Sequence, residues 1–468
     1  MVDRRWVLPA TTWAVVLCGL TTTTGAQDRA RDRRRLIAPG QVTSDDPRRV
    51  PMPAEPRGPA GTTVLRGGRV FDGTGAPARA ATVILERNRI ARIVAPTVQD
   101  WPRDARVIDV SGKTVMPGLI DLHTHLSYIE PPTSTTESAS DQDAALRAAE
   151  RLRYFVESGI TSVRDVASVG NVPFVLKQWV ARNALPGPRV FAAGQLLTAR
   201  GGHGADGREI ALDASVIERT GADAWRLAVR DLFARGADVI KVASHFSREE
   251  VKAAVDEAHA LGLKVTCDCE TFYIQWAVEA GVDMIEHPLP RSDETIRLMA
   301  QRGTEADPTV YVYTYFFGRF GGGYFGSTSR RFHFGDSLNV DVVRRMKAAG
   351  IKMGIGTDLI VDWFRSLPHP YINELKYFTQ VGYSVPEALV AATRTNAELL
   401  DMEDKLGTLE AGKLADVLVV NGRPDEALDD LAKVELVIRD GWVVVEGGRV
   451  VVPRHQPADA PPIWRPRP

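Results

Sequence analysis

Two histidines stand two residues apart in the apolar run GLIDLHTHLS, residues 118–127. On a β-strand, His123 and His125 would present their imidazoles on one face, where two neutral ring nitrogens can bind a cation such as zinc. Asp121 precedes His123 by two and shares this face, so it either orients a ligand histidine or bonds to backbone. The first chemistry that these residues suggest is metal binding.

Further polar residues end apolar runs later in the chain, such as DVIKVAS, KVTCDCE, DMIEHP and KMGIGTD. The residues at or near these ends are Lys241, Asp268, His287 and Asp358. The runs alternate with helical patterns such as REEVKAAVDEAHALG, and eight strands can be drawn. We therefore predict an α/β fold, a parallel (β/α)8 TIM barrel whose carboxyl-terminal rim gathers these side chains.

The flanks of this middle part have another pattern. Residues 62–115 and 406–452 hold short alternating runs with Gly-rich turns, which predict antiparallel strands. We expect the two flanks to form one small β-sandwich domain beside a barrel of residues 116–405. Residues 27–61 and the tail 453–468 are rich in Arg and Pro, and this composition predicts unpacked chain.

The N-terminus has the order of a secretory signal peptide. Arg4 and Arg5 precede the apolar run WVLPATTWAVVLCGL, and small residues follow up to Ala26. The run is shorter than the about 20 residues that span a bilayer, although a membrane anchor is the alternative. We expect residues 1–26 to direct export to the periplasm or the extracellular space, with no stable membrane span after their removal.

Composition excludes several classes of partner. The chain has 468 residues, 44% of them apolar, with 58 Lys and Arg against 59 Asp and Glu. A net charge of -1 gives no general attraction to nucleic acid, so a small molecule is the expected partner. Without the signal, Cys267 and Cys269 are the remaining cysteines. Because residues two apart on a strand are poorly placed to bridge, we expect no disulfide between them.

The segments PGLIDLHTHL, VIKVAS, IEHP, IGTD and GTLEAGKLADVLVV, in this order, resemble the amidohydrolase superfamily, in the imidazolonepropionase-like branch with its metal-dependent dipeptidases. The resemblance spans residues 62–452. It implies that His123, His125, Lys241 and Asp358 hold a buried divalent metal, most simply Zn²⁺. It also implies that Lys241 is carboxylated and bridges two ions; a lysine paired with a nearby acid is the alternative.

The resemblance implies a second ion held by His287 and a fifth-strand histidine. This sequence reads KVTCDCET there and has no histidine. Counting from the strand start selects Asp268, whereas counting back from AVEAGVDMIEHP selects Cys267, so both assignments stay open. Either residue binds zinc and makes the site more anionic than imidazole would. We expect one or two ions per chain.

Substrate contacts are expected from two loops. His203, in TARGGHG, resembles a substrate-contacting histidine of this branch, and a surface turn is the alternative. The segment YVYTYFFGRFGGGYFGSTSRRFHFG is aromatic and Gly-rich, so it could form a wall for an apolar substrate group or a buried extension. Within it, Tyr311, Arg330 and Arg331 are our candidates for substrate binding, the arginines for a carboxylate.

Together these features predict hydrolysis of a carbon–nitrogen amide bond by metal-activated water. We expect Asp358 to pass the proton to the leaving nitrogen, and His287 or His203 to stabilise the oxyanion together with the metal. A dipeptide or an N-acyl amino acid is the predicted substrate. A cyclic amide or imidazolone-type ring is one alternative, and an exported binding protein with an impaired second metal site is another. A homo-oligomer is left open.

Overall fold

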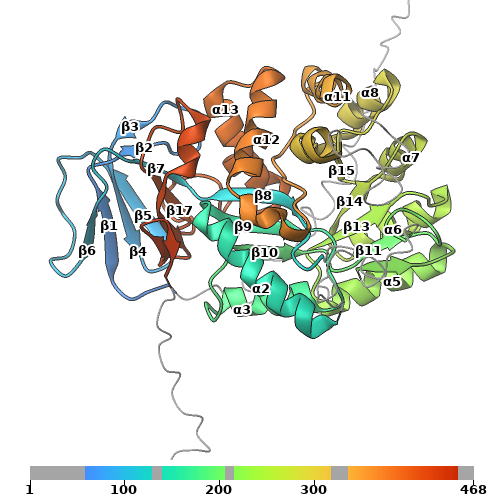
Figure 1. Cartoon of the computed structure of the whole chain (residues 1–468), viewed down its shortest axis with the longest axis horizontal. Coiled ribbons are helices and arrows are strands. Elements are labelled where there is room, and N and C mark those ends of the chain that lie inside the picture. The colour runs from blue at the N-terminus through green and yellow to red at the C-terminus, as the bar shows by residue number, and fades with distance from the viewer. Residues whose placement is uncertain (1–57, 129–139, 206–214, 318–335, 452–468) are drawn as a thin grey trace, which may run out of the picture.

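The computed structural model describes residues 58–128, 140–205, 215–317 and 336–451. Figure 1 shows two regions, a smaller one built mainly of strands and a larger one in which strands and helices alternate. No helix in these four ranges is long and apolar enough to cross a membrane. The predictions that fall outside the described residues are the signal peptide 1–26, most of the linker 27–61, the tail 453–468, Arg330 and Arg331.

Strands from both ends of the chain pair in one seven-stranded sheet, where the blue and red ribbons of Figure 1 meet. Strand β7 (Thr114–Pro117) pairs antiparallel with β17 (Val417–Val420) and so joins the two flanks. The sheet order is β20-β19-β18-β17-β7-β2-β3, with β2 (Arg69–Val70), β3 (Arg79–Ala80), β18 (Val434–Arg439), β19 (Trp442–Glu446) and β20 (Arg449–Val450). The domain limits themselves stay a prediction.

A four-stranded sheet completes the smaller region. Its order is β5-β4-β1-β6, with β1 (Thr62–Arg66), β4 (Thr82–Glu86), β5 (Arg89–Val94) and β6 (Arg106–Asp109). Alternate residues of both sheets, among them Val83, Leu85, Val417 and Val419, form one buried apolar cluster. The period of two along each strand directs these side chains to one face, as the alternating sequence predicts.

The larger region is built on parallel strands. One sheet has the order β10-β9-β8, with β8 (Leu119–Thr124), β9 (Ile160–Asp165) and β10 (Arg189–Ala192). The other has the order β12-β11-β13-β14-β15-β16, with β11 (Leu196–Thr198), β12 (Val216–Glu218), β13 (Val239–Ala243), β14 (Lys264–Asp268), β15 (Met284–Glu286) and β16 (Glu305–Asp307). The parallel α/β class is confirmed.

Single parallel bridges continue this arrangement around the eighth segment. Met353 pairs with Ala306, and Leu359 pairs with Thr124, so residues 353–359 lie between β16 and β8. Among the described residues, β10 and β11 belong to separate sheets, and no closed ring of strand pairs is formed. The structure therefore supports an open arrangement of parallel strands, which is less than the closed barrel that the sequence predicts.

Helices connect the strands and cover them. They are α2 (Asp141–Glu157), α3 (Val172–Ala181), α5 (Ala222–Arg235), α6 (Arg248–Ala260), α7 (Phe272–Ala280), α8 (Asp293–Arg302), α11 (Asp336–Ala348), α12 (His369–Gln380), α13 (Val385–Val390) and α14 (Asn396–Leu399). Helix α6 begins with a capping box, in which the Ser247 side chain accepts from Glu250 N and the Glu250 side chain accepts from Ser247 N. Covered by such helices, every residue of β8 and β13 is buried, polar side chains included.

Candidate metal centre

His123 and His125 bring their Nε2 atoms to 3.3 Å of each other at the end of β8. Both residues are buried, and each Nδ1 has a partner on another segment. His123 Nδ1 lies 2.9 Å from Glu286 Oε2, and His125 Nδ1 lies 3.0 Å from the carbonyl oxygen of Ala167. A carboxylate and a carbonyl can only accept, so both Nδ1 atoms carry the proton and both Nε2 atoms present a lone pair.

Asp358 closes this side of the cluster. Its Oδ1 lies 3.4 Å from His123 Nε2 and 3.2 Å from His125 Nε2, and its Oδ2 lies 3.8 Å from His287 Nδ1. The backbone holds the carboxylate there, because Asp358 N donates to His123 O at 2.8 Å. The predicted meeting of the two early imidazoles with the late carboxylate is therefore observed.

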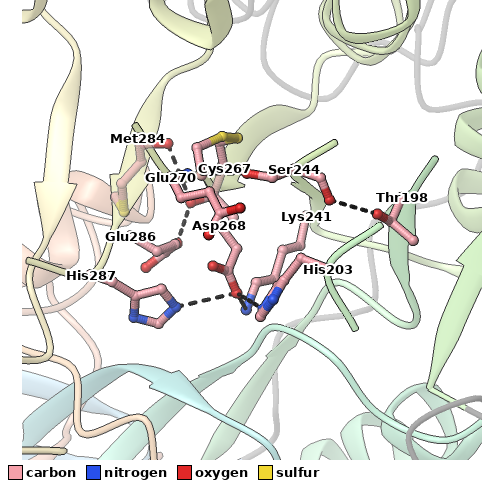
Figure 2. The surroundings of a disulfide bond; sticks show 12 residues. Thr198, His203, Lys241, Ser244, Cys267, Asp268, Glu270, Met284, Glu286 and His287 are labelled. Atoms are coloured by element: carbon pink, nitrogen blue, oxygen red, sulfur yellow. Dashed lines mark hydrogen bonds and ion pairs between the residues drawn. A yellow bond between two sulfur atoms is a disulfide. The ribbon is translucent and has the colours of Figure 1, made fainter. Parts of the chain in front are cut away.

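Asp268 gathers the other side of the cluster (Figure 2). Its Oδ2 lies 3.2 Å from each of three atoms, His203 Nε2, Lys241 Nζ and His287 Nε2. Burial alone would raise the pKa of Asp268, but the charges of these three groups hold it well below its usual range. Of the two fifth-strand assignments that the sequence left open, Asp268 is the one that faces the site, and Cys267 is not.

Cys267 and Cys269 correct another prediction, because the structure joins them in a disulfide (Figure 2). Their Cα atoms are 5.3 Å apart. Strand β14 ends at Asp268, so Cys269 follows the last strand residue and is not bound to strand geometry. Figure 2 shows the bridge on the side of Asp268 away from His203, Lys241 and His287. It is part of the core and not of the cluster.

Nitrogen and carboxylate groups that fit a divalent metal thus meet in one place. We call this set of seven side chains the polar cluster: His123, His125, His203, Lys241, Asp268, His287 and Asp358. Lys241 Nζ lies 3.3 Å from His123 Nε2 and so connects the two sides. Burial lowers the pKa of His123 well below its usual range, and it lowers that of His125 as well. The Nε2 lone pairs of neutral imidazoles repel the Asp358 carboxylate that they face, unless a cation lies between them. His123, His287 and Asp358 each offer a ligand atom within 4.8 Å of the others.

Asp121 has the second of its two predicted roles. Its Oδ1 accepts from the backbone N–H groups of His123 and Thr357, at 3.1 and 3.0 Å, and its Oδ2 accepts from Thr357 Oγ1 at 2.6 Å. It thus holds β8 against the segment that carries Asp358. Burial raises the pKa of the Asp121 carboxyl to about 7.

The aromatic segment contributes a different tyrosine from the one predicted. Tyr311 N donates to Glu374 Oε2, and the Tyr311 ring stacks on Tyr315. Tyr313, two residues later, is buried with its ring 4.7 Å from that of His287. Residues 312–317 form a wide helical turn where we had expected a loop, and this turn directs Tyr313 to the cluster. Tyr128 stacks on another imidazole of the cluster, with its ring centroid 4.3 Å from that of His125.

Sequence reasoning also missed two residues behind the cluster. Glu286 and Thr309 bond to the outer nitrogens of His123 and His287 and are fully buried. A signal was present, since Glu286 directly precedes His287 at the end of β15. His287, Thr309 and Asp358 all have positive φ, at 65°, 42° and 51°. Such backbone is rare outside glycine and is concentrated at functional sites.

Comparison with known proteins agrees with this geometry. The imidazolonepropionase of Symbiobacterium thermophilum is 27% identical over 401 residues, which cover 76% of this chain and 87% of that protein. A prolidase complexed with N-methylphosphonate-L-proline superposes with a TM-score of 0.73 at 29% identity, covering 82% of this chain and 100% of the other. A Xaa-Pro dipeptidase with bound methionine gives 0.73 at 28% identity, with the same coverage.

The match to a family extends over most of the described chain. Residues 114–445 match the Amidohydrolase family, a range that contains every residue of the polar cluster. The relatives described above bear the names imidazolonepropionase, prolidase and Xaa-Pro dipeptidase. The chain belongs to the amidohydrolase family and is a hydrolase of carbon–nitrogen bonds.

Proposed function

We propose that this chain hydrolyses the amide bond of a dipeptide or an N-acyl amino acid, with a divalent metal at the polar cluster and zinc as the ion. The observation that carries the proposal is the convergence on Asp358 Oδ1 of two imidazole Nε2 atoms, at 3.2 and 3.4 Å. Imidazole and carboxylate ligands are those of catalytic zinc sites.

The residues that would hold the ions lie on two sides. His123, His125 and Asp358 form one donor set, and His287 and Asp268 form the other. When bound, zinc lowers the pKa of a water molecule to about 7 and polarises the amide carbonyl. The carboxylation of Lys241 stays a prediction from resemblance, and the intact mass of the protein checks it. In the present geometry Lys241 Nζ pairs with Asp268 Oδ2.

Asp358 is the proposed acid–base group of the reaction. It reaches solvent slightly, at 8% exposure, and its two oxygens face different imidazoles. This position lets one carboxylate accept a proton from the attacking water and deliver it to the leaving nitrogen. His203, whose Nε2 lies 3.2 Å from Asp268 Oδ2, is placed on the far side as a donor to the oxyanion.

The choice of substrate rests on the neighbours and on the aromatic walls. Tyr313 and Tyr128 border the cluster on two sides and provide apolar surface for a substrate side chain or ring. The prolidase and Xaa-Pro dipeptidase neighbours support dipeptides, those ending in proline first. The curated relatives named imidazolonepropionase favour the second candidate, a cyclic amide of imidazolone type.

Two further proposals concern the closure of the barrel and the N-terminal segment. We propose that β8–β10, β13–β16 and residues 353–359 close into the eight-stranded barrel of the family, supported by the bridges at Thr124 and Ala306. We also propose that residues 1–26 export the chain from the cytoplasm. Sequencing the N-terminus of the secreted protein checks the second proposal.

The test of function combines metal analysis with hydrolysis. Zinc content of the purified protein is measured before and after chelation, and release of free amine is followed with N-acyl amino acids, Xaa-Pro dipeptides and cyclic amides. We expect turnover of the first two classes that is lost on chelation and restored by zinc. The zinc content of Asp268→His, measured beside that of the wild type, shows whether a histidine at this position changes the number of ions bound per chain. Turnover that survives complete metal removal would refute the proposal.

A further inference from the structure

Three imidazoles of the polar cluster differ in what holds their outer nitrogens. His123, His125 and His287 each place Nδ1 within 2.8 to 3.0 Å of an oxygen on another segment. The oxygens belong to the Glu286 carboxylate, the Ala167 carbonyl and the Thr309 hydroxyl. Among these three, His123 alone has a carboxylate within hydrogen-bond distance of Nδ1, since Asp358 Oδ2 lies 3.8 Å from His287 Nδ1. A charged acceptor makes the stronger hydrogen bond.

Glu286 is itself held from the other side. Its Oε1 accepts from Arg164 Nη2 at 2.7 Å and from Thr266 Oγ1, while its Oε2 faces His123 Nδ1. Arg164 Nε is fixed in turn by the carbonyl oxygen of Leu122. Every partner of the carboxylate is a donor, and the Arg164 guanidinium offsets its buried charge. The orientation of Glu286 is therefore set before any ligand arrives.

We propose that Glu286 is a positioning residue of the metal centre. By accepting the Nδ1 proton of His123, it fixes the tautomer whose Nε2 lone pair faces the cation, and it increases electron donation from that nitrogen. Outer partners of this kind commonly contribute to metal affinity. The inference rests on the proposed function in so far as His123 is taken to be a metal ligand.

The same strand offers a matched control at its other end. Asp283, just before β15, accepts from His259 Nε2 at 2.8 Å and from Val265 N at 2.8 Å. This pair is also a buried carboxylate and histidine, but His259 lies on α6, outside the polar cluster. Asp283 and Glu286 thus differ in whether the histidine belongs to the cluster, while burial and chemistry are shared.

The experiment measures zinc affinity of the full chain by competition with a chromophoric chelator. In Glu286→Gln, the amide places a donor where His123, or else Arg164 and Thr266, requires an acceptor. We expect a loss of zinc affinity of about 10- to 100-fold. Glu286→Asp keeps the charge on a shorter side chain, so its loss is intermediate. Asp283→Asn binds zinc as the wild type does.

Urea unfolding of the metal-free proteins provides the second readout. Both Glu286→Gln and Asp283→Asn are expected to unfold more easily, which a purely structural role also predicts, so stability alone does not decide. If Glu286→Gln does not fold, Glu286→Asp against Asp283→Asn decides.

Zinc affinity in Glu286→Gln equal to the wild type, or an equal loss in Asp283→Asn, would overturn the inference and leave the proposed function standing. A wild-type chain that binds no zinc would overturn both.

Discussion

The two ends of the parallel strands β13 to β16 carry similar charges in different arrangements. At the amino ends, charges pair locally: Lys264 Nζ lies 3.3 Å from Glu305 and 3.2 Å from Asp401, and Lys177 Nζ lies 2.6 Å from Asp238. At the carboxyl ends, one Asp268 oxygen meets three nitrogen-bearing side chains at 3.2 Å. The charged side chains thus form separate pairs at the amino ends and one shared cluster at the carboxyl ends.

The two arrangements also act on pKa in opposite directions. Among the amino-end acids, burial raises the pKa of Glu305 to about 7, because the Lys264 charge does not offset the loss of water. At the carboxyl end, Asp268 is as deeply buried, yet its pKa is held well below its usual range by three surrounding groups. An ion pair whose members neutralise each other stabilises the fold. Several side chains that converge on one carboxylate oxygen and shift its pKa are instead typical of a binding or catalytic site.

The largest expected effect comes from breaking the convergence at Asp358. Asp358→Asn keeps the shape of the side chain but removes the charge and the proton acceptor. We expect kcat/KM for amide hydrolysis to fall by about 10⁴-fold, which is about 5 kcal/mol of transition-state stabilisation. Circular dichroism of the variant should match the wild type. Retention of a tenth of the activity would remove Asp358 from the reaction.

The second effect concerns stability at Asp268. Asp268→Asn removes the carboxylate that lies 3.2 Å from the buried Lys241 ammonium. The same substitution removes the charged partner of His203 and His287. Removing one member of a buried ion pair costs about 3–5 kcal/mol. We expect a loss of this size in urea unfolding of the metal-free protein. A change below about 1 kcal/mol would mean that convergence here carries no electrostatic stabilisation.

The sequence predicted the residues at the strand ends well, because apolar runs and motif order both locate them. It could not choose between Cys267 and Asp268, since the last four residues of β14 are all buried and alternation of burial gives no register. The place of Glu286 just before His287 was a signal that it lies near the site, but its pairing with His123, 163 positions away, could not be predicted. Long-range contacts of this kind leave no local periodicity.

Local backbone explains the remaining errors. The disulfide of Cys267 and Cys269 was excluded on strand geometry, but the strand ends between them at Asp268. Tyr313 was not among the candidates, because a Gly-rich aromatic segment suggests an open loop. Residues 312–317 instead form a helical turn, in which positions two apart face different sides.

The third effect is a dependence of the free energy of unfolding on pH, which tests the contrast between the pKa of Glu305 and that of Asp268. Glu305 has a folded pKa of about 7, above the ordinary value of 4.5, so the folded state retains a proton that the unfolded state releases. Stability therefore falls as pH rises from 4.5 to about 7, by up to about 1.4 kcal/mol per pH unit. Glu305→Gln lacks this contribution.

We expect the difference in unfolding free energy between wild type and Glu305→Gln to change across this window. Urea unfolding at pH 5, 6 and 7 measures it, with the variant gaining relative to the wild type at each step by the sign just given. Parallel pH profiles would show that Glu305 is already ionised in the folded protein, and that the Lys264 charge suffices after all.

The smallest effect is expected at a half-exposed pair of the amino end, Lys177 with Asp238. Lys177→Met keeps the length of the side chain and its packing on α3 while removing the charge. Asp238 stays satisfied, because its Oδ2 also accepts from Ala192 N at 2.9 Å, and both side chains reach solvent. A loss of about 1 kcal/mol in unfolding free energy follows, with kcat/KM unchanged. A fall in kcat/KM without loss of stability would mean that the Lys177 charge at the amino ends affects the polar cluster at the carboxyl ends electrostatically. The two ends would then be coupled and not separate.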